Sequence, residues 1–256
     1  MPTLSIYIMA QNEARRIRST LENVKDIADE IVIIDGGSTD ETVSICREYS
    51  ERIFVHPFEG YAKQRRYAMT KVTGDWVLAI DADETLSTEL HDSIRALILA
   101  VDVDAYEFSR RNYVKPGCWL KYGGLYPDWQ RRLFRREKGE YGAVVHSGEV
   151  PSITGQIRRF NLDIIHDQID NNILYRWSKL MKFVRAEVAD TKRSHAFGYY
   201  IYRSIYDFLL TIWKGYFLRA GFKMGWMGVR LAISHAVWRF LVDLGLAFKK
   251  ERAGDV

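Results

Sequence analysis

Short apolar runs alternate with stretches of helical periodicity along the front of the chain. Four runs have the length of a buried strand, and they span residues 4–9, 30–35, 52–56 and 75–80. The helical stretches between them span residues 12–24 and 61–72, and a further helix is expected after the glycines of the segment GGSTDET. Repeated strand and helix units of this length predict a parallel sheet with helices on its faces, so the expected fold class is α/β.

The rear of the chain has a different pattern, with helical spacing and many aromatic residues. Helices are expected over residues 172–182 and 195–213, and over a closing segment that begins at Gly225. No uncharged apolar run reaches about 18 residues, so a membrane-spanning helix is not expected. We therefore divide the chain into an α/β domain over residues 1–170 and a helical region over residues 171–256.

Composition agrees with a globular protein, and charge separates its two parts. The chain has 256 residues, of which 47% are hydrophobic, and this is enough for a core. Residues 1–170 contain 22 Lys and Arg against 27 Asp and Glu, whereas residues 171–256 contain 15 against 6. The rear is thus basic as well as aromatic, and an apolar, anionic partner is expected for it. Cys46 and Cys118 lie far apart without metal-ligand spacing, which favours a reducing cytoplasm.

Polar clusters follow three of the predicted strands. They read AQNE, DGGSTD and DADE, and the carboxyl ends of parallel strands meet at one edge of a sheet, where such sheets bind ligands. Asp81 and Asp83 are two residues apart, a spacing that in extended chain points both side chains to one side. The two carboxylates would repel each other unless a divalent cation lay between them and a ligand. Oxygen ligands favour Mg²⁺ or Mn²⁺, so a metal site is predicted here.

Three ordered segments resemble the sequence blocks of the family 2 glycosyltransferases. They are LSIYIMAQNEA, EIVIIDGGSTDET and GDWVLAIDADE, and the resemblance covers about the first hundred residues. It implies the GT-A fold, with a Rossmann-like, mostly parallel sheet, and a nucleotide-sugar donor. The segments YPDWQRRLFRR and VVHSGE and the aromatic tail are most similar to the β-1,4-glucosyltransferases of the bacterial lipopolysaccharide inner core. That similarity implies transfer of glucose from a UDP-sugar to a lipopolysaccharide-core or other glycolipid acceptor.

The resemblance also implies roles for individual residues. It assigns the nucleotide sugar to Gln11, Asn12, Glu13, Asp35, Gln64, Arg65, Asp81, Ala82 and Asp83, and the metal to Asp83. Glu13 would lie near the ribose, and Asp35 would accept a hydrogen bond from the uracil ring. Structural roles fit three of these residues as well. Asp35 would cap the GGST turn, Glu13 would be a first-turn helix carboxylate, and Arg65 would lie on a solvated helix face.

A second carboxylate, Asp128, is the candidate catalytic base. It follows glycines and a proline in YGGLYPDWQRRLFRR, so it is expected on a loop that leads into a strand. In an inverting transfer, a carboxylate within hydrogen-bond reach takes the proton of the attacking acceptor hydroxyl. The alternative is a Pro-Asp turn residue without chemistry.

His146 is the candidate second metal ligand. It follows Val144 and Val145, as the end of a strand would, and the resemblance implies that a histidine here completes the metal site. The glutamate that usually follows is replaced by SGE, which leaves the choice of base open between Asp128 and Glu149. His166 and His195 are interpreted as structural.

The composition of the C-terminal region, residues 171–256, predicts the location of the protein in the cell. Trp, Tyr and Phe interleaved with Lys and Arg are typical of helices that lie in the headgroup region of an anionic bilayer. The expected location is cytoplasmic, peripheral on the cytoplasmic face of the inner membrane. The alternative is that these helices pack on the catalytic domain or form a homodimer.

Two other function classes fit parts of the sequence. A nucleotidyltransferase that makes nucleotide sugars would share the fold and metal, but MAQNEARR lacks the glycine-rich loop expected of it. A nucleic-acid-binding protein would explain the basic, aromatic tail. No recognition motif supports that reading, and the acidic front would repel a phosphate backbone, so no nucleic acid partner is expected.

Overall fold

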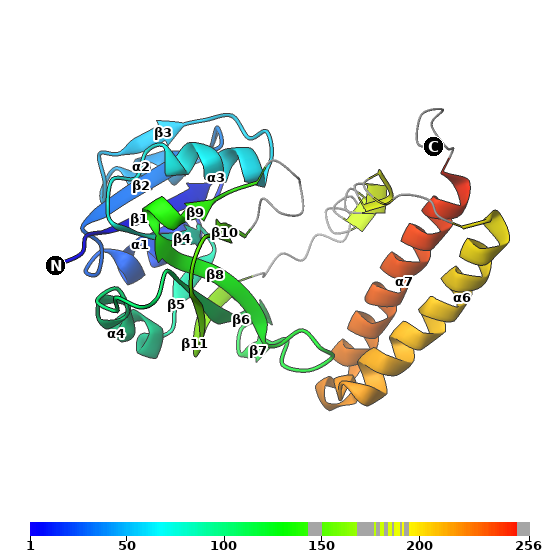
Figure 1. Cartoon of the computed structure of the whole chain (residues 1–256). Helices are drawn as coiled ribbons and strands as arrows, with labels where there is room; N and C mark the ends of the chain where they lie inside the picture. The colour runs from blue at the N-terminus through cyan, green and yellow to red at the C-terminus, as the bar shows by residue number, and fades with distance from the viewer. Residues whose placement is uncertain are drawn as a thin grey trace. The chain divides into compact units, whose positions relative to one another are not determined.

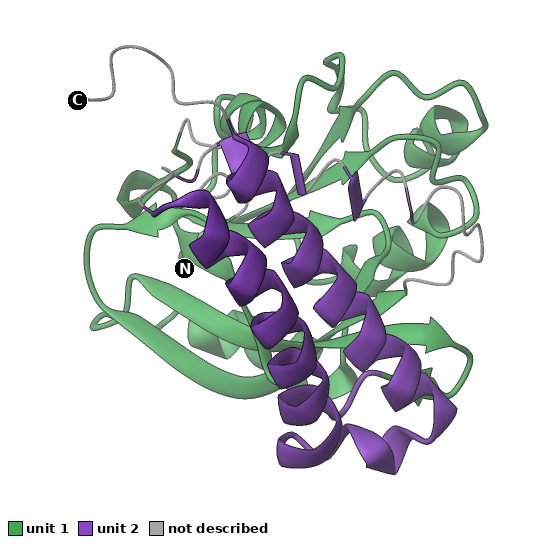
Figure 2. Cartoon of the chain, turned by 90° about the vertical axis from the view of Figure 1, so that its right-hand side faces the viewer, with its two compact units in different colours: residues 1–119, 127–168 green, residues 120–126, 169–256 purple. Residues whose placement is uncertain are grey.

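The computed structural model describes residues 1–142, 150–167 and 195–249, together with scattered residues between Trp177 and Thr191. It divides into two compact units, which Figure 2 shows in different colours. The first unit comprises Met1–Trp119 and Pro127–Gln168, and the second comprises Leu120–Tyr126 and Ile169–Val256. The loop Leu120–Tyr126 therefore belongs with the C-terminal helices, although the chain reaches it before the first unit is complete.

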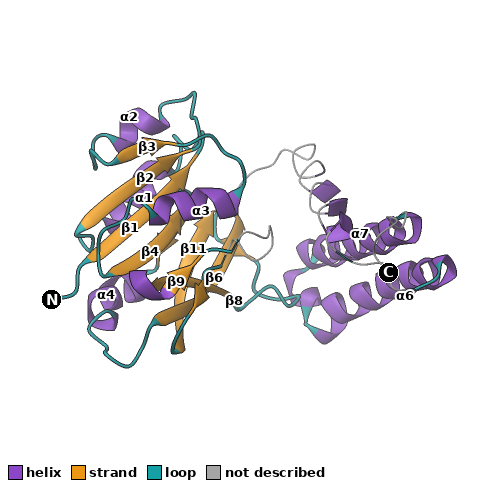
Figure 3. Cartoon of the chain, turned by 45° about the horizontal axis from the view of Figure 1, so that its top comes forward, coloured by secondary structure: helices purple, strands orange, loops and turns teal. Residues whose placement is uncertain are grey.

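The first unit is built on a nine-stranded sheet of order β3-β2-β1-β4-β8-β6-β11-β5, with β7 paired to β6 (Figure 3). The strands are β1 (Leu4–Ala10), β2 (Glu30–Asp35), β3 (Ile53–Val55), β4 (Trp76–Asp81), β5 (Glu84–Leu86), β6 (Ala105–Lys115), β7 (Cys118–Trp119), β8 (Asp128–Arg135) and β11 (Ile157–Asp167). A separate ribbon joins β9 (Gly139–Glu140) to β10 (Ser152–Ile153). Strands β3, β2, β1 and β4 are mutually parallel, and β8 lies antiparallel between β4 and β6.

Helices cover both faces of this sheet because apolar residues point to both sides of each central strand. In β1, Ile6 and Ile8 pack with Leu21 of α1 (Ile17–Val24) and with Ile94 of α4 (Thr88–Leu97). Tyr7 points the opposite way, into a second core that includes residues from α3 (Tyr61–Met69) and its C-terminal turn. A short helix, α2 (Thr42–Cys46), follows the glycine turn after β2. The predicted α/β fold with helices on both faces and a helical C-terminus is confirmed.

The first helix begins later than the periodicity predicted. It starts at Ile17 rather than at residue 12, because Asn12 has a left-handed backbone with φ of 56°. Asn12 tolerates this conformation better than most residues, because its short polar side chain forms local hydrogen bonds. Residues 11–16 therefore remain a loop at the carboxyl end of β1, close to the segment that follows β2.

The second unit contains a hairpin of two long helices (Figure 1). Helix α6 (Phe197–Trp213) continues into a π-helical segment (Lys214–Leu218), and a 3₁₀ turn (Gly221–Met224) leads into α7 (Trp226–Phe248). A backbone hydrogen bond of 2.9 Å from Gly123 N to Arg219 O attaches the loop Leu120–Tyr126 to the tip of the hairpin.

Helix α7 is long and apolar enough to cross a membrane, by length and composition alone. The most apolar part of this helix has a mean hydropathy of 1.4, and 33% of it is buried inside the second unit. The helix contains no uncharged apolar run of about 18 residues, because Arg230, Arg239 and Asp243 interrupt it. The expectation that no helix spans a membrane stays a prediction.

Candidate active site

The polar clusters predicted at the strand ends meet at one edge of the sheet. Register pairs Ala10 at the end of β1 with Asp35 at the end of β2, and it pairs Met9 with Asp81 at the end of β4. Strand order reverses between β1 and β4, and ligands of open α/β sheets bind outside the carboxyl ends at such a point. The start of β8 and the later parts of β6 and β11 reach the same edge.

Asp35 holds the turn that follows β2. Its carboxylate is 2% exposed and accepts hydrogen bonds from the backbone of Gly37 and Ser38 at 3.1 Å, and from Ser38 Oγ at 2.5 Å. Asn12 joins the same turn, because its Oδ1 accepts a bond of 2.8 Å from Thr39 N. Gln11 donates from Nε2 to Gly36 O at 3.0 Å. These contacts correspond to the capping role for Asp35, and its role toward uracil stays a prediction.

Glu13 and Gln64 also make specific internal contacts. Glu13 Oε2 accepts a bond of 2.8 Å from Arg16 Nε, and burial raises the pKa of Glu13, with a smaller effect of Arg16 in the opposite direction. The negative charge of Asp83 raises this pKa further. Gln64 is buried, and its amide contacts both the ring and the backbone carbonyl of His56. Glu13 is thus close enough to Asp83 for the two charges to interact. Gln64 instead forms hydrogen bonds with His56, the residue that follows β3.

Six charged side chains of alternating sign form a continuous chain along the site. In order they are Arg65, Asp81, Arg132, Glu84, Arg110 and Asp128. Consecutive members have N···O distances between 2.8 and 3.0 Å. The charged chain contains three positive and three negative groups, so each buried charge has a partner of opposite sign. This pairing reduces the free-energy cost of burying the six side chains. Arg65 is therefore part of the site and does not lie on a solvated helix face, since it is 3% exposed.

The expected arrangement of the two aspartates is wrong. Asp81 ends β4, whereas Ala82 and Asp83 form a turn before β5, so the two side chains do not leave an extended strand together. The carboxylate of Asp81 contacts Arg65 and Arg132. Although burial raises the pKa of Asp81, these two guanidinium groups hold it well below its ordinary value. Arg65 and Arg132 therefore already neutralise the carboxylate of Asp81 without a metal. The carboxylate of Asp83 has other neighbours.

Asp83 faces His166, a residue that the sequence reading set aside as structural. The distance from His166 Nε2 to Asp83 Oδ2 is 3.3 Å, and Arg16 Nη1 lies 3.9 Å from the same oxygen. His166 lies near the end of β11, after the short apolar run Leu162–Ile165. His166 is therefore also a polar residue directly after a short apolar run, which is the pattern that identified the other strand ends.

Asn112 determines how His166 is oriented. Its Nδ2 donates to Asp128 Oδ2 at 3.1 Å, and because a carboxylate only accepts, this assigns the orientation of the amide. Asn112 Oδ1 then lies 2.7 Å from His166 Nδ1, which must carry a proton to donate to it. In a neutral ring, the lone pair of Nε2 consequently points at Asp83. Two acceptors 3.3 Å apart repel each other unless a proton or a cation lies between them.

Asp128 is the first residue of β8, at the end of the charged chain. Its Oδ2 accepts from Arg110 and Asn112, whereas its Oδ1 accepts one bond from the described residues, of 2.8 Å from Gln130 Nε2. Burial raises the pKa of Asp128, but Arg110 and the other donors lower it below its ordinary value. The group is thus held as a carboxylate, with a lone pair of Oδ1 left for a further donor.

Other predicted residues lie elsewhere. His146 and Glu149 fall outside the described residues. The His195 ring lies 4.2 Å from the ring of Tyr199, in the second unit. Among the residues that the structure describes, no group of three or more His, Cys, Asp or Glu side chains is arranged to hold a metal. The pair Asp83 and His166 is therefore what the described part of the sheet edge offers to a cation.

Comparison with known proteins identifies the family. The family model for glycosyl transferase family 2 matches residues 5–182. The lipopolysaccharide core biosynthesis glycosyltransferase LpsC of Rhizobium meliloti (strain 1021) is 30% identical over 257 residues, which cover 93% of this chain and 89% of LpsC. An uncharacterized glycosyltransferase of Rickettsia felis is 32% identical over 171 residues, which cover 64% of this chain and 57% of the relative. The matches to the Rickettsia relatives thus span about half of their length or less.

Solved structures show a looser likeness. The glucosyl-3-phosphoglycerate synthase of Mycobacterium tuberculosis, crystallised with Mg²⁺ and uridine diphosphate, is 19% identical with a TM-score of 0.48. The match covers 69% of this chain and 74% of the synthase. The match of the family model over more than half of the sequence decides the assignment. This chain belongs to glycosyl transferase family 2.

Proposed function

We propose that the protein is an inverting glycosyltransferase that moves a hexose, with glucose as the expected sugar, from a UDP-sugar to a hydroxyl of a lipopolysaccharide-core or other glycolipid acceptor. Mg²⁺ or Mn²⁺ would assist the reaction. The observation that carries this proposal is the pair Asp83 and His166, whose facing oxygen and nitrogen atoms require a cation or a proton between them.

The donor set at this pair fits a divalent cation. A carboxylate oxygen and an imidazole nitrogen suit Mn²⁺, and a histidine ligand typically donates its other ring N–H to a neighbouring acceptor, as His166 does to Asn112. Such ions take few protein ligands and complete their shell with phosphate oxygens and water. A bound cation would stabilise the negative charge that develops on the diphosphate leaving group. His146 stays a predicted further ligand.

Buried donors beside the pair fit an anionic ligand. Arg132 Nε and Nη1 and Arg65 Nε are buried without a hydrogen-bond partner within the described part of the chain. Buried donors are normally paired with protein, water or ligand. Their position next to Asp81 is consistent with the predicted contacts of Arg65 and Asp81 with the nucleotide sugar.

Asp128 is suited to take the proton of the acceptor hydroxyl. It is held ionised by Arg110, and its Oδ1 keeps room to accept one more hydrogen bond. Asn112 links this carboxylate to His166, so the proposed base and the proposed metal ligand are positioned by one amide. The similarity to LpsC along 93% of the chain supports an acceptor of the lipopolysaccharide-core type.

An exposed apolar stripe on α6 supports a membrane location. Five side chains at helical spacing are each at least 50% exposed, and they are Tyr202, Ile205, Tyr206, Leu209 and Trp213. The surrounding region is basic, and no Asp or Glu occurs between Asp207 and Asp243. Large exposed apolar patches mark interaction sites, and positive charge favours anionic lipids. We therefore retain a peripheral location on the cytoplasmic face of the inner membrane, and a homodimer contact is the alternative occupant.

Binding and turnover test the proposal. Isothermal titration of the full chain with UDP should give binding that strengthens with Mn²⁺ or Mg²⁺. Donor hydrolysis across UDP-sugars and other nucleotide sugars should then reveal the preferred donor. Synthesis of a nucleotide sugar from a nucleoside triphosphate and a sugar phosphate would instead identify a nucleotidyltransferase. Absence of any metal-dependent UDP binding would contradict the proposal.

A further inference from the structure

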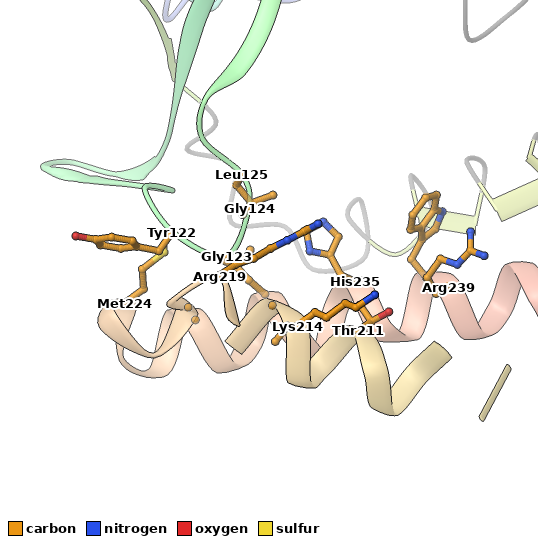
Figure 4. Close-up of a pocket in the computed structure, with 16 residues that line it drawn as sticks. Tyr122, Gly123, Gly124, Leu125, Thr211, Lys214, Arg219, Met224, His235 and Arg239 are labelled. Atoms are coloured by element: carbon orange, nitrogen blue, oxygen red, sulfur yellow. The ribbon is translucent and has the colours of Figure 1, made fainter. Parts of the chain in front are cut away.

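The second unit contains an open cavity of about 320 Å³ between the loop Leu120–Tyr126 and the helical hairpin (Figure 4). All of its lining residues belong to the second unit. The volume lies at the lower end of the range of about 300 to 1,000 Å³ that is typical of small-molecule sites. It exceeds what a bare inorganic anion fills.

The lining of this cavity is cationic and contains no carboxylate. Its basic side chains are Lys214, Arg219, His235 and Arg239. Arg239 lies 3.4 Å from Asp207 and is thereby paired, whereas no described carboxylate pairs with Lys214 or Arg219. The cavity therefore has two positive charges without a protein counter-ion among the described residues. Both side chains are exposed at the mouth of the cavity, and an anionic ligand there would be attracted to both.

The side chains of Arg219 and His235 approach each other in the cavity, as Figure 4 shows. Burial lowers the pKa of His235, and the positive charge of Arg219 lowers it further. Arg219 is fixed against the loop, because its backbone carbonyl accepts from Gly123 N at 2.9 Å. Its side chain also packs so closely on Gly124 that a Cβ there would lie 2.5 Å from Arg219 Cδ. A side chain at Gly124, whose φ is 82°, would therefore push the Arg219 side chain aside.

Most of the remaining lining is apolar. It comprises Leu125, Met224, Leu231, Ala232 and Trp238, among others. An aromatic ring beside a few polar anchors suits a ligand that combines a charged group with an apolar or sugar face.

We propose that this cavity binds a phosphate monoester, with the phosphate on Lys214 and Arg219 and the organic part against Trp238. A phosphate monoester carries about −1.5 to −2 charges at neutral pH and three acceptor oxygens, which match these two cations, for which no counter-ion occurs among the described residues. This site is additional to the proposed transferase site, which uses residues of the first unit. Its ligand is either a phosphorylated saccharide or the monoester headgroup of a lipid.

Titration calorimetry on the full chain tests the soluble source. Glucose 6-phosphate should bind, and glucose should not. Arg219→Gln and, separately, Lys214→Gln should each weaken the binding about ten-fold or more, as expected for the loss of a charge-assisted hydrogen bond. Arg230→Gln is the matched control, because Arg230 is an exposed cation of α7 outside the lining, and it should change the affinity less than about two-fold. The NMR signal of the His235 ring should shift on addition of glucose 6-phosphate.

Vesicles test the lipid source. Sedimentation with phosphatidylcholine vesicles that contain phosphatidic acid, and its selective loss in Arg219→Gln and Lys214→Gln, would identify a lipid headgroup as the ligand. Equal effects of the Arg219 and Arg230 variants would overturn the proposal, and so would absence of binding in both arms. Metal-dependent UDP binding, measured in the same variants, should be unchanged. If the unsubstituted protein does not bind UDP in a metal-dependent way, this contradicts the proposed function but not the proposed cavity site.

Discussion

Asn112 connects the two chemical groups on which the proposed reaction depends. Its amide contacts Asp128 on one side and His166 on the other, at 3.1 and 2.7 Å. The amide thereby directs Nε2 of His166 toward Asp83. A single side chain of β6 thus sets both the state of the proposed base and the tautomer of the proposed ligand.

His166→Ala should reduce metal-dependent UDP binding as strongly as Asp83→Ala does, because each removes one of the two ligands proposed among the described residues. Loss of a metal ligand or its support commonly lowers metal affinity about 10–100-fold or more. Calorimetric titration of UDP with and without Mn²⁺ measures the effect, and His195→Ala is the control histidine from the second unit. Full metal dependence in His166→Ala would remove this residue from the metal site.

Asp128→Asn should leave UDP binding intact and slow turnover by about two to four orders of magnitude, the usual contribution of a general base. The amide keeps the shape of the carboxylate but cannot accept a proton. Steady-state turnover with a competent acceptor measures the loss. Asp102→Asn, an exposed aspartate paired with Arg158 before β6, should retain normal turnover. Unchanged turnover in Asp128→Asn would show that another group, such as Glu149, is the base.

The residues whose shared position could be predicted from the sequence are those next to short parallel strands. Asp35, Asp81 and Asp83 follow buried runs, and their shared edge follows from the parallel arrangement. The pairing of Asp81 with Arg132 could not be predicted, because 51 positions separate the two residues and no periodicity relates them. His166 was missed because its strand was not recognised as part of the same sheet.

Strand β8 creates the charged chain by its position between β4 and β6. It runs antiparallel to both, and its register brings Arg132 within reach of Asp81 and Glu84. The alternation of strands and helices predicted the parallel half of the sheet. Strand order beyond β4 depends on pairing between distant segments, which the local apolar pattern of RRLFRR does not specify.

Glu30 should make the first unit less stable in acid. At the start of β2 it accepts hydrogen bonds of 2.9 and 3.0 Å from Thr73 N and Oγ1, and it pairs with Arg52. Burial raises the pKa of Glu30, but its hydrogen bonds and Arg52 lower it overall. The stabilisation is therefore present above the ordinary glutamate pKa of about 4.3 and is lost as the pH falls through the lower value in the folded protein.

Glu30→Gln should consequently lower the free energy of unfolding by about 1 kcal/mol or more at pH 7. The difference from the unsubstituted protein should shrink as the pH falls below about 4. Urea denaturation at several pH values measures both effects. Glu51→Gln, at an exposed glutamate before β3, should show neither. A difference that stays constant with pH would contradict the assigned contacts.

Gly228→Ala should destabilise the hairpin of the second unit. A Cβ at Gly228 would lie 1.9 Å from the backbone oxygen of Gly221, so the backbone at the start of α7 must shift. Overpacking of this kind typically costs about 1–3 kcal/mol. Gly198→Ala in the first turn of α6 is the control, since a Cβ there meets nothing within 4 Å. Thermal unfolding followed by circular dichroism should show a lower midpoint for Gly228→Ala and an equal or higher one for Gly198→Ala.

The whole molecule combines a sheet edge suited to a charged donor with a basic, aromatic helical unit. In the sequence, the two parts differ in the sign of their net charge and in their content of aromatic residues. Their physical roles differ, because the α/β unit provides buried, fixed charges, whereas α6 leaves large apolar side chains in contact with solvent.

Replacement of Leu209 and Trp213 by serine should reduce sedimentation with anionic liposomes, because the two side chains lie on the exposed stripe at 62% and 52% exposure. Val101→Ser, at an exposed apolar residue of the first unit, is the control and should bind as the unsubstituted protein does. If the stripe instead holds two copies together, the double variant should change the mass measured by analytical ultracentrifugation and leave liposome binding unaltered.

The loop Leu120–Tyr126 has a practical consequence for dissecting the protein. Because this loop lies between β7 and β8 but packs on the hairpin, the polypeptide passes from one unit to the other three times. A truncation near residue 170 would leave seven loop residues in the shortened chain without the helices that hold them. A single proteolytic cut near residue 168 would likewise leave the loop on the first unit, so a clean genetic separation of the two units requires a short linker in place of this loop.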